Sequence, residues 1–279
     1  SLRQENLVIK QDNEEFKLPF EDIGVLLIES RQSTLSTALI DACVQHKVAV
    51  MVCDEKHLPS GVFQPYQQHS RQSKVILSQL ALTEPFKKRL WQSVIMQKIR
   101  NQKMVCGLIK GEAPVDFDYY LSTVQSGDTL NREATAARLH FSTLFPDGIT
   151  RGSEHVLNDA LNYGYAIIRG AIARSLASYG FLTSIGINHV NELNNFALAD
   201  DLMEPYRPYV DHLVFSTIDK DAKELTKEMR DRLVGVLAHD VQIDGKAHSL
   251  LRAVELTAQS LVTAIDSKDV DKLLLPVLV

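Results

Sequence analysis

The stretch LPSGVFQPYQQHSRQS, residues 58–73, separates two parts of the chain that have different hydrophobic periods. It holds two prolines, a glycine and mostly polar residues, which is the composition of a connecting segment. Short apolar runs typical of strands precede it, and apolar residues at helical spacing follow it. The sequence therefore predicts an α+β fold, with a small β-rich domain over 1–60, a linker over 61–72 and a larger all-α-helical domain over 73–279.

The predicted N-terminal domain is built around a strand–helix–strand unit. The segments GVLLIES, residues 24–30, and VAVMVCD, residues 48–54, are near-continuous apolar runs of the kind that form buried strands. Between them, STLSTALIDACVQHK, residues 33–47, has apolar residues at helical spacing behind Ser33 or Thr34, either of which can cap a helix. Two shorter strands are predicted at 6–9 and 16–20.

The second domain is predicted to be helical throughout. The expected helices lie at about 72–82, 85–106, 116–124, 129–144, 156–179, 196–206, 220–239 and 247–265. Asp244–Gly245 is a tight-turn signal between the last two of them.

The composition is that of an ordinary globular protein. Hydrophobic residues make up 45% and charged residues 23% of the 279 positions. The three cysteines form no CxxC pair, and Cys43 and Cys53 lie in apolar runs, which favours buried thiols over a disulfide framework. No apolar run approaches the roughly 20 residues of a membrane span. The start, SLRQENLVI, has no signal-peptide core, so we expect a cytoplasmic protein with no membrane partner.

The charge is distributed unevenly along the chain. The formal net charge is −5, yet residues 70–110 hold nine basic residues and a single acid, a local charge of +8 that leaves −13 for the rest. Such asymmetry is compatible with an anion-binding surface on an acidic protein, and equally with a solvated helix face.

The stretch NHVNELNNFALADDLMEPYRP, residues 188–208, crowds carboxylates beside a histidine. A helix advancing by about 100° per residue places Asp200, Asp201 and Glu204 on one edge, opposite an apolar stripe. Pro205 should kink or end that helix, and His189 can fold back onto the acids. The cluster is either a solvated acidic face or a site for Mg²⁺ or Mn²⁺, which suits carboxylates and imidazole better than a structural zinc site does.

A further ligand for such a site could come from GDTLNREATAARLHF, residues 127–141. Asp128 can cap this helix. Glu133 borders an apolar stripe that is predicted to be buried, and a carboxylate at that border needs a partner. The partner is either a neighbouring arginine or a metal ion. The stripe is predicted to contain Leu130, Ala134, Ala137, Phe141 and Leu144.

Four segments, taken together, resemble a known family. They are VMVCDEKHLPSG at 50–61, NREATAARLHF at 131–141, LNYGYAIIRGAIARSL at 161–176 and GINHVNELNNFALADDLMEPYRP at 186–208. With them the chain resembles the CRISPR adaptation integrase, the first of the CRISPR-associated proteins, in its type II form. The most specific part is LNYGY followed by a histidine and DDLMEP.

The resemblance implies a divalent metal, Mg²⁺ or Mn²⁺, held by Glu133, His189 and Glu204, with Asp201 supporting them in catalysis. It implies a metal-dependent DNA endonuclease and integrase that inserts a short duplex, the prespacer, into the CRISPR repeat by attack of a 3′-hydroxyl on a phosphodiester. It also implies a homodimer, paired through the β-rich domain over 1–60 and with its catalytic site in the helical domain over 73–279, that joins a small second adaptation protein in a heterohexamer. The family usually has an extra strand ahead of the position of Ser1, so we expect the β-rich domain to lack its first strand.

The same resemblance gives the basic residues a role on DNA. Arginines and lysines could follow the phosphates without reading bases, and Tyr165 could either stack on a splayed base or pack in the core. The residues expected to bind DNA are Arg71, Lys74, Lys87, Lys88, Arg89, Arg132, Arg138, Arg207 and Tyr165.

Two alternative functions stay open from the sequence. One is a metal-dependent nuclease that cleaves branched DNA or RNA without integration. The other is a non-catalytic nucleic-acid-binding scaffold in which the acids form only an ion-pair network.

Overall fold

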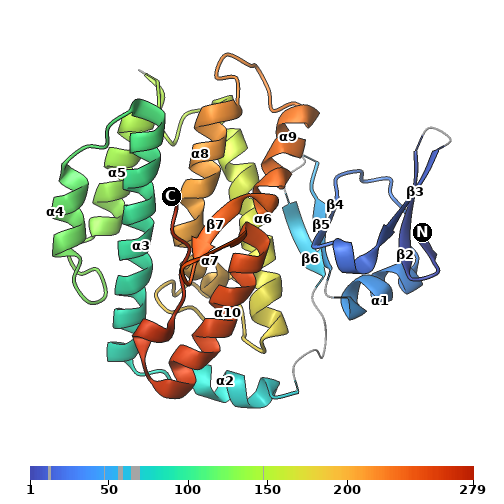
Figure 1. Ribbon diagram of the computed structural model, residues 1–279, viewed down its shortest axis with the longest axis horizontal. Helices are drawn as coiled ribbons and strands as arrows, with labels where there is room; N and C mark the ends of the chain where they lie inside the picture. The colour runs from blue at the N-terminus through green and yellow to red at the C-terminus, as the bar shows by residue number, and fades with distance from the viewer. Residues whose placement is uncertain (12–13, 47, 56–58, 64–69, 147) are drawn as a thin grey trace. The chain divides into compact units, whose positions relative to one another are not determined.

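The computed structural model describes residues 1–11, 14–46, 48–55, 59–63, 70–146 and 148–279. Two compact units, Ser1–Ser70 and Arg71–Val279, make up the chain. The predicted α+β class is confirmed, because strands dominate the first unit and helices the second (Figure 1). In the described residues, no helix is both long and apolar enough to cross a lipid bilayer.

The first unit contains two three-stranded sheets. The strands are β1 (Leu2–Arg3), β2 (Asn6–Gln11), β3 (Glu14–Pro19), β4 (Val25–Ile28), β5 (Ala49–Cys53) and β6 (Pro59–Phe63). The first three form an antiparallel sheet, and β4 pairs in parallel with β5, which pairs antiparallel with β6. Helix α1 (Thr37–Gln45) connects β4 to β5 and buries Leu39 and Cys43 against Leu7 and Phe20. The predicted strand–helix–strand unit is therefore confirmed, with Ser36 as the capping residue instead of Ser33 or Thr34.

The linker predicted over 61–72 is partly wrong. Its first three residues belong to β6, which begins at Pro59 at the edge of the sheet, where a missing backbone N–H costs no ladder bond. Its last residue, Gln72, begins a helix. Residues 56–58 and 64–69 lie outside the described part of the chain.

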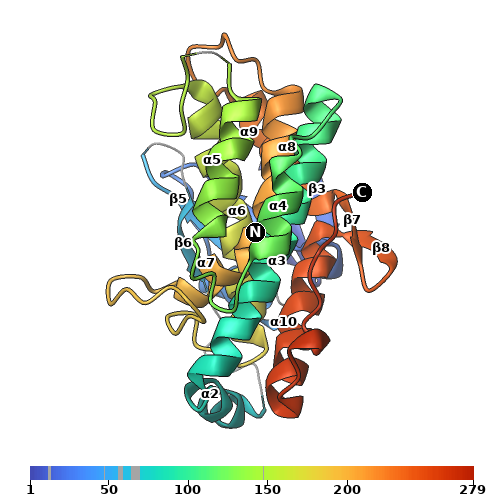
Figure 2. The same cartoon turned by 90° about the vertical axis from the view of Figure 1, so that its left-hand side faces the viewer.

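The second unit is organised around one long helix. The helices are α2 (Gln72–Leu80), α3 (Glu84–Lys110), α4 (Asp116–Thr123), α5 (Arg132–Leu144), α6 (Val156–Ser178), α7 (Ala197–Met203), α8 (Arg207–Thr217), α9 (Lys227–Val234) and α10 (Leu250–Ser267). Helix α3 packs against α4, α5 and α8, and α6 packs against α7, α8 and α10 (Figure 2).

Pro205 breaks the predicted helix 196–206 as expected. Helix α7 ends at Met203, a 3₁₀ turn η2 (Glu204–Tyr206) follows, and α8 begins at Arg207. The carbonyl of Pro205 accepts a hydrogen bond from Nδ2 of Asn101 on α3 at 2.7 Å. Helix α8 itself was not predicted, because Pro205 and Pro208 act as breakers in a sequence pattern, although a proline in the first turn of a helix needs no donor.

The prediction of an all-helical second unit is wrong over 240–249. There β7 (Asp240–Ile243) and β8 (Lys246–Ser249) form an antiparallel hairpin between the 3₁₀ turn η3 (Gly235–Ala238) and α10. The tight turn predicted at Asp244–Gly245 is confirmed, since both residues have positive φ, 52° and 70°. A turn of this type favours paired strands on both of its sides. The helical structure before it therefore ends ahead of Asp240, and α10 begins only at Leu250.

Helices α6 and α8 approach closely at Gly164. A β-carbon there would lie 2.5 Å from Cγ1 of Val210 on α8, whereas one at Gly107 on α3 would meet no atom within 4 Å. We therefore predict that Gly164→Ala lowers the free energy of unfolding by about 1–3 kcal/mol, because the two helices have to separate. Gly107→Ala should be neutral or stabilise by up to about 1 kcal/mol. Urea denaturation of both variants measures the difference, and equal effects would contradict the close-packing argument.

Candidate metal centre

A single buried carboxylate holds the loop that precedes α7. Asp201, which is fully buried, accepts hydrogen bonds from the backbone N–H groups of Asn188 at 2.9 Å and His189 at 3.1 Å, and a third from Ile187. Its Oδ1 also accepts Nδ1–H of His189 at 2.6 Å. Because a buried carboxylate needs several donors to replace its hydration, the loop closes around Asp201 and fixes the imidazole with it.

Gly186 leaves the space in which this loop closes. A β-carbon at that position would lie 2.5 Å from the carbonyl oxygen of His189 and 2.8 Å from Oδ2 of Asp201. Any larger residue would therefore push the loop away from the carboxylate.

The imidazole of His189 is both held and accessible. The hydrogen bond to Asp201 raises the pKa of His189 above its ordinary value, and the carboxylates of Asp201, Glu204 and Asp200 act in the same direction against partial burial. The side chain is 43% exposed. Since Nδ1 donates to Asp201, Nε2 on the other side of the ring is left to meet a ligand, which is the usual arrangement of a metal-binding imidazole.

Two carboxylates from different elements meet on one ammonium group. Nζ of Lys98 on α3 forms ion pairs with Oε1 of Glu133 on α5 and with Oε2 of Glu204 in η2. Lys98 and Glu204 are only 3% and 4% exposed, and Glu133 is half-buried. Burial alone would lower the pKa of Lys98 and raise that of Glu204. The attraction between the charges outweighs burial, so the pKa of Lys98 is raised and that of Glu204 lowered.

A second cation flanks Glu204. Nε of Arg207 lies 3.3 Å from Oε1 of Glu204, and the guanidinium group lies over the ring of Tyr165, 4.9 Å from its centroid. The hydroxyl of Tyr165 donates to the buried Asp211, whose other oxygen lies 2.9 Å from Nε2 of His140. Arg207 thus lies between Glu204 and the ring of Tyr165, which is hydrogen-bonded through Asp211 to His140.

The donor set fits a divalent cation, although the three predicted ligands are not assembled around one point. In the part of the chain that the structure describes, no group of three His, Cys, Asp or Glu side chains is close enough to hold a metal ion. Lys98 lies between two of the ligands. Oε2 of Glu204 is buried, and apart from this ion pair it has no hydrogen-bond partner among the described residues. Two converging carboxylates and a held imidazole suit Mg²⁺ or Mn²⁺, so the site stays a prediction that the chemistry supports.

The comparison with protein families decides where the chain belongs. The family model described as CRISPR associated protein Cas1 matches residues 1–240. A CRISPR-associated endonuclease Cas1 of Neisseria meningitidis serogroup C (strain 8013) is 39% identical over 279 residues, 99% of this chain and 92% of that protein. The chain belongs to the Cas1 family. A CRISPR-associated endonuclease Cas1 of Francisella tularensis subsp. novicida is 23% identical over 75% of the chain and 72% of its own length.

Solved structures share the Cas1 fold with this chain at low identity. A Cas1 protein from Thermotoga maritima has a TM-score of 0.74 at 13% identity and covers 95% of this chain and 93% of its own. A casposase bound to integration product has a TM-score of 0.75 at 20% identity and covers 96% of this chain and 88% of its own.

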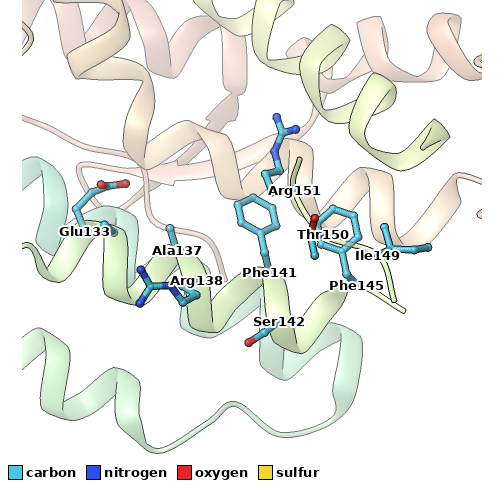
Figure 3. A pocket seen from close by; sticks show the side chains of 10 residues that line it. Glu133, Ala137, Arg138, Phe141, Ser142, Phe145, Ile149, Thr150 and Arg151 are labelled. Atoms are coloured by element: carbon cyan, nitrogen blue, oxygen red, sulfur yellow. The ribbon is translucent and has the colours of Figure 1, made fainter. Parts of the chain in front are cut away.

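A pocket of about 500 Å³ begins at Glu133 of this Cas1 chain and continues along α5. Figure 3 shows Glu133 at one end and Arg151 beside Phe141, with the guanidinium carbon 5.9 Å from the ring centroid. The predicted burial of the α5 stripe is confirmed only at Leu144. Leu130 precedes the helix and is 47% exposed, while Ala134, Ala137 and Phe141 are only half-buried, which leaves room for the pocket. The fully covered face of α5 contains Ala136 and His140 together with Leu144.

The predicted DNA contacts fall into two groups. Arg71, Lys74, Lys88, Arg89 and Arg138 are exposed. Of these, Lys74 forms an ion pair with Asp266 at 2.8 Å.

The second group is less accessible. Lys87 is half-buried and lies 3.2 Å from Glu84, and Arg132 lies over the ring of Tyr119 at 4.9 Å. Tyr165 is 8% exposed, and its ring contacts Arg207 and Arg151. In this structure Tyr165 therefore positions two arginines.

The sequence did not predict the role of Lys98, which contacts both Glu133 and Glu204. Lys98 lies at the i+4 position after Val94, inside the buried stripe of α3, where a charged residue has to find a partner. The helical period alone therefore predicts that Lys98 is buried. No local pattern predicts the contact between Asp211 and His140, because the two residues are 71 positions apart.

Asp201 should control the protonation of His189. We predict that Asp201→Asn lowers the pKa of His189, because the raised value depends first on the hydrogen bond to this carboxylate. A raised pKa in the folded state means that the pair stabilises the protein at low pH and that this contribution is lost as the pH rises through the folded pKa. NMR titration of the imidazole in metal-free protein measures the change, and Asp200→Asn, which removes the weakest of the contributing charges, should have a smaller effect.

Proposed function

We propose that this Cas1 protein is a metal-dependent DNA endonuclease and integrase of type II CRISPR adaptation, which joins a short prespacer duplex to the CRISPR repeat. The observation that supports it most is the meeting of Glu133 and Glu204, from two elements far apart in sequence, on a single cation beside the held imidazole of His189. The most similar relatives described above are named CRISPR-associated endonucleases, and one structure of similar fold is a casposase bound to integration product.

The reaction replaces one phosphodiester bond by another. A 3′-hydroxyl attacks the phosphorus, loses its proton, and the oxygen of the old ester bond departs and takes up a proton. With water as the attacking group the same site gives cleavage. Mg²⁺ or Mn²⁺ held by Glu133, His189 and Glu204 would supply Lewis-acid activation of the phosphate and of the attacking hydroxyl.

The surrounding residues bind and orient the substrate. Arg207 lies beside Glu204 with its guanidinium group fixed over Tyr165, so it can place a phosphate next to the carboxylates. Asp201 keeps Nδ1 of His189 protonated and its ring in one orientation. The pocket that begins at Glu133 is lined by apolar side chains together with Arg138 and Arg151, which suits a strand end entering the site.

The proposal includes partners. By family membership we propose a homodimer that joins the small second adaptation protein in a heterohexamer and holds double-stranded DNA. A structure of similar fold, described as a Cas6-RT-Cas1--Cas2 complex, has a TM-score of 0.71 at 21% identity and covers 98% of this chain and 34% of its own.

One observation favours the scaffold alternative. Glu133 and Glu204 are already neutralised by Lys98, which is the ion-pair network that a non-catalytic protein would have. A nucleic-acid-binding scaffold, however, gives no reason for Asp201 to fix an imidazole whose Nε2 faces away from it. Variants of the three proposed ligands separate the two functions.

We predict that Glu204→Gln, Glu133→Gln and His189→Ala each reduce metal-dependent joining by at least about 100-fold while DNA binding persists, because each removes one metal ligand. The assay follows joined product on a plasmid that carries a repeat, with the second adaptation protein and Mn²⁺ or Mg²⁺ present. Glu112→Gln, an exposed carboxylate just beyond α3, is the matched control.

Joining that survives in all three variants would rule out the proposed site. If the wild type and the control variant cleave DNA in a metal-dependent reaction but form no joined product, the integrase function is ruled out and the nuclease function stands.

DNA affinity should depend on the exposed start of α3. We predict that Lys88→Gln with Arg89→Gln weakens binding of a short duplex and reduces the slope of log affinity against log salt by about 0.9 for each lost phosphate contact. Lys246→Gln, an exposed lysine in the β7–β8 hairpin, should change neither quantity. Fluorescence anisotropy between 50 and 200 mM salt, roughly the range over which such contacts are screened, measures both. An unchanged slope in the double variant would show that DNA binds elsewhere.

A further inference from the structure

The ion-paired groups at Glu204 balance one another without a metal ion. Two carboxylates, Glu133 and Glu204, are matched by two cations, Lys98 and Arg207, all within ion-pair distance of a neighbour. Lys98 is 3% and Glu204 4% exposed, so the attraction between these two groups is little screened by water. A divalent cation entering this cluster of four groups would therefore meet carboxylates that are already paired with cations.

The ammonium group of Lys98 occupies the position between the two carboxylates that a metal ion shared by both would take. Nζ of Lys98 contacts Oε1 of Glu133 and Oε2 of Glu204, so it lies between the carboxylates that a cation would have to share. The four-carbon side chain of lysine is flexible and carries a compact charge, which makes displacement from the carboxylates possible without a change in α3.

We propose that Lys98 is a built-in counter-cation of this centre, which holds Glu133 and Glu204 in the metal-free protein and has to move before a divalent cation binds. The inference rests on the proposed metal site. Lys98 makes metal binding by the free protein weak and couples it to DNA, because an arriving phosphate gives the displaced ammonium group a new partner.

The position of the pocket supports this coupling. It begins at Glu133, one of the two carboxylates that Lys98 contacts, and Arg138 is among its lining residues, so a phosphate bound there can reach the neighbourhood of Glu133. Adding a divalent cation alone leaves the cluster of four groups with excess positive charge, whereas adding cation and phosphate together reduces that excess. Metal and DNA should therefore each raise the affinity for the other, as linkage requires.

The experiment measures Mn²⁺ binding to the full chain by calorimetry at fixed pH, with and without a short DNA duplex. We expect Lys98→Met and Lys98→Gln to bind Mn²⁺ at least about tenfold more tightly than the wild type without DNA, because a buried positive charge beside the ligands has been removed. DNA should then strengthen Mn²⁺ binding less in these variants than in the wild type. Lys103→Met, on the same helix with an exposed ion pair to Asp118, is the control and should leave both values unchanged.

Unchanged or weaker Mn²⁺ binding in the Lys98 variants, with wild-type binding that Glu204→Gln abolishes, would overturn this inference and leave the metal site standing. Mn²⁺ binding that does not depend on Glu204 in any variant would overturn both. If neither Lys98 variant folds, the rate of chemical acetylation of Lys98 in the wild-type protein tests the inference instead. Reaction at Lys98 should be slow without ligands and increase with Mn²⁺ and DNA, relative to Lys103, and a rate that does not respond would overturn the inference.

Discussion

The ammonium group of Lys98 is the contact on which the arrangement of the centre depends. It ties α3, α5 and the turn η2 together through the carboxylates of Glu133 and Glu204. Lys98 and Glu204 are almost fully buried, so neither of these two charges can be solvated alone, whereas Glu133 is half-buried. Removing one partner of a buried ion pair typically costs about 3–5 kcal/mol, so the spacing of the three elements is fixed by charge as much as by apolar packing. A divalent cation would offer the same oxygens a stronger charge, so the proposed metal-free and metal-bound states would use one set of carboxylates.

Two other buried carboxylates give this cluster a rigid surrounding. Asp201 is satisfied by the backbone of the loop that carries His189, and Asp211 by the side chains of Tyr165 and His140. Asp201 closes the loop that precedes α7, whereas Asp211 joins residues 46 and 71 positions away. Each orients one further group, an imidazole in the first case and, through Tyr165, an arginine in the second. The proposed exchange at Lys98 would therefore take place beside charges that are held in position by hydrogen bonds.

The sequence predicted the parts of this structure that depend on local pattern. The change of hydrophobic period separated strands from helices, Pro205 marked the end of α7, and Asp244–Gly245 marked a turn. The β7–β8 hairpin and α8 were missed, because there turn geometry and the tolerance for proline in a first helical turn override the helical period. The pairing partner of Glu133 depends on a contact 35 residues away, which no periodicity specifies.

Glu204 and Arg207 face the same cluster because they lie three residues apart, at the start of the 3₁₀ turn η2 and directly after it. The α-helical geometry gives way to this turn at Pro205, because proline has no backbone N–H to donate to the carbonyl of Asp201. The carbonyl of Pro205 accepts a hydrogen bond from Asn101, which comes from the same helix as Lys98, one turn further along. Glu204 and Lys98 are thereby held opposite each other by two contacts between η2 and α3, one polar and one ionic. The turn at Pro205, which the sequence marks only as the end of a helix, thus provides both contacts.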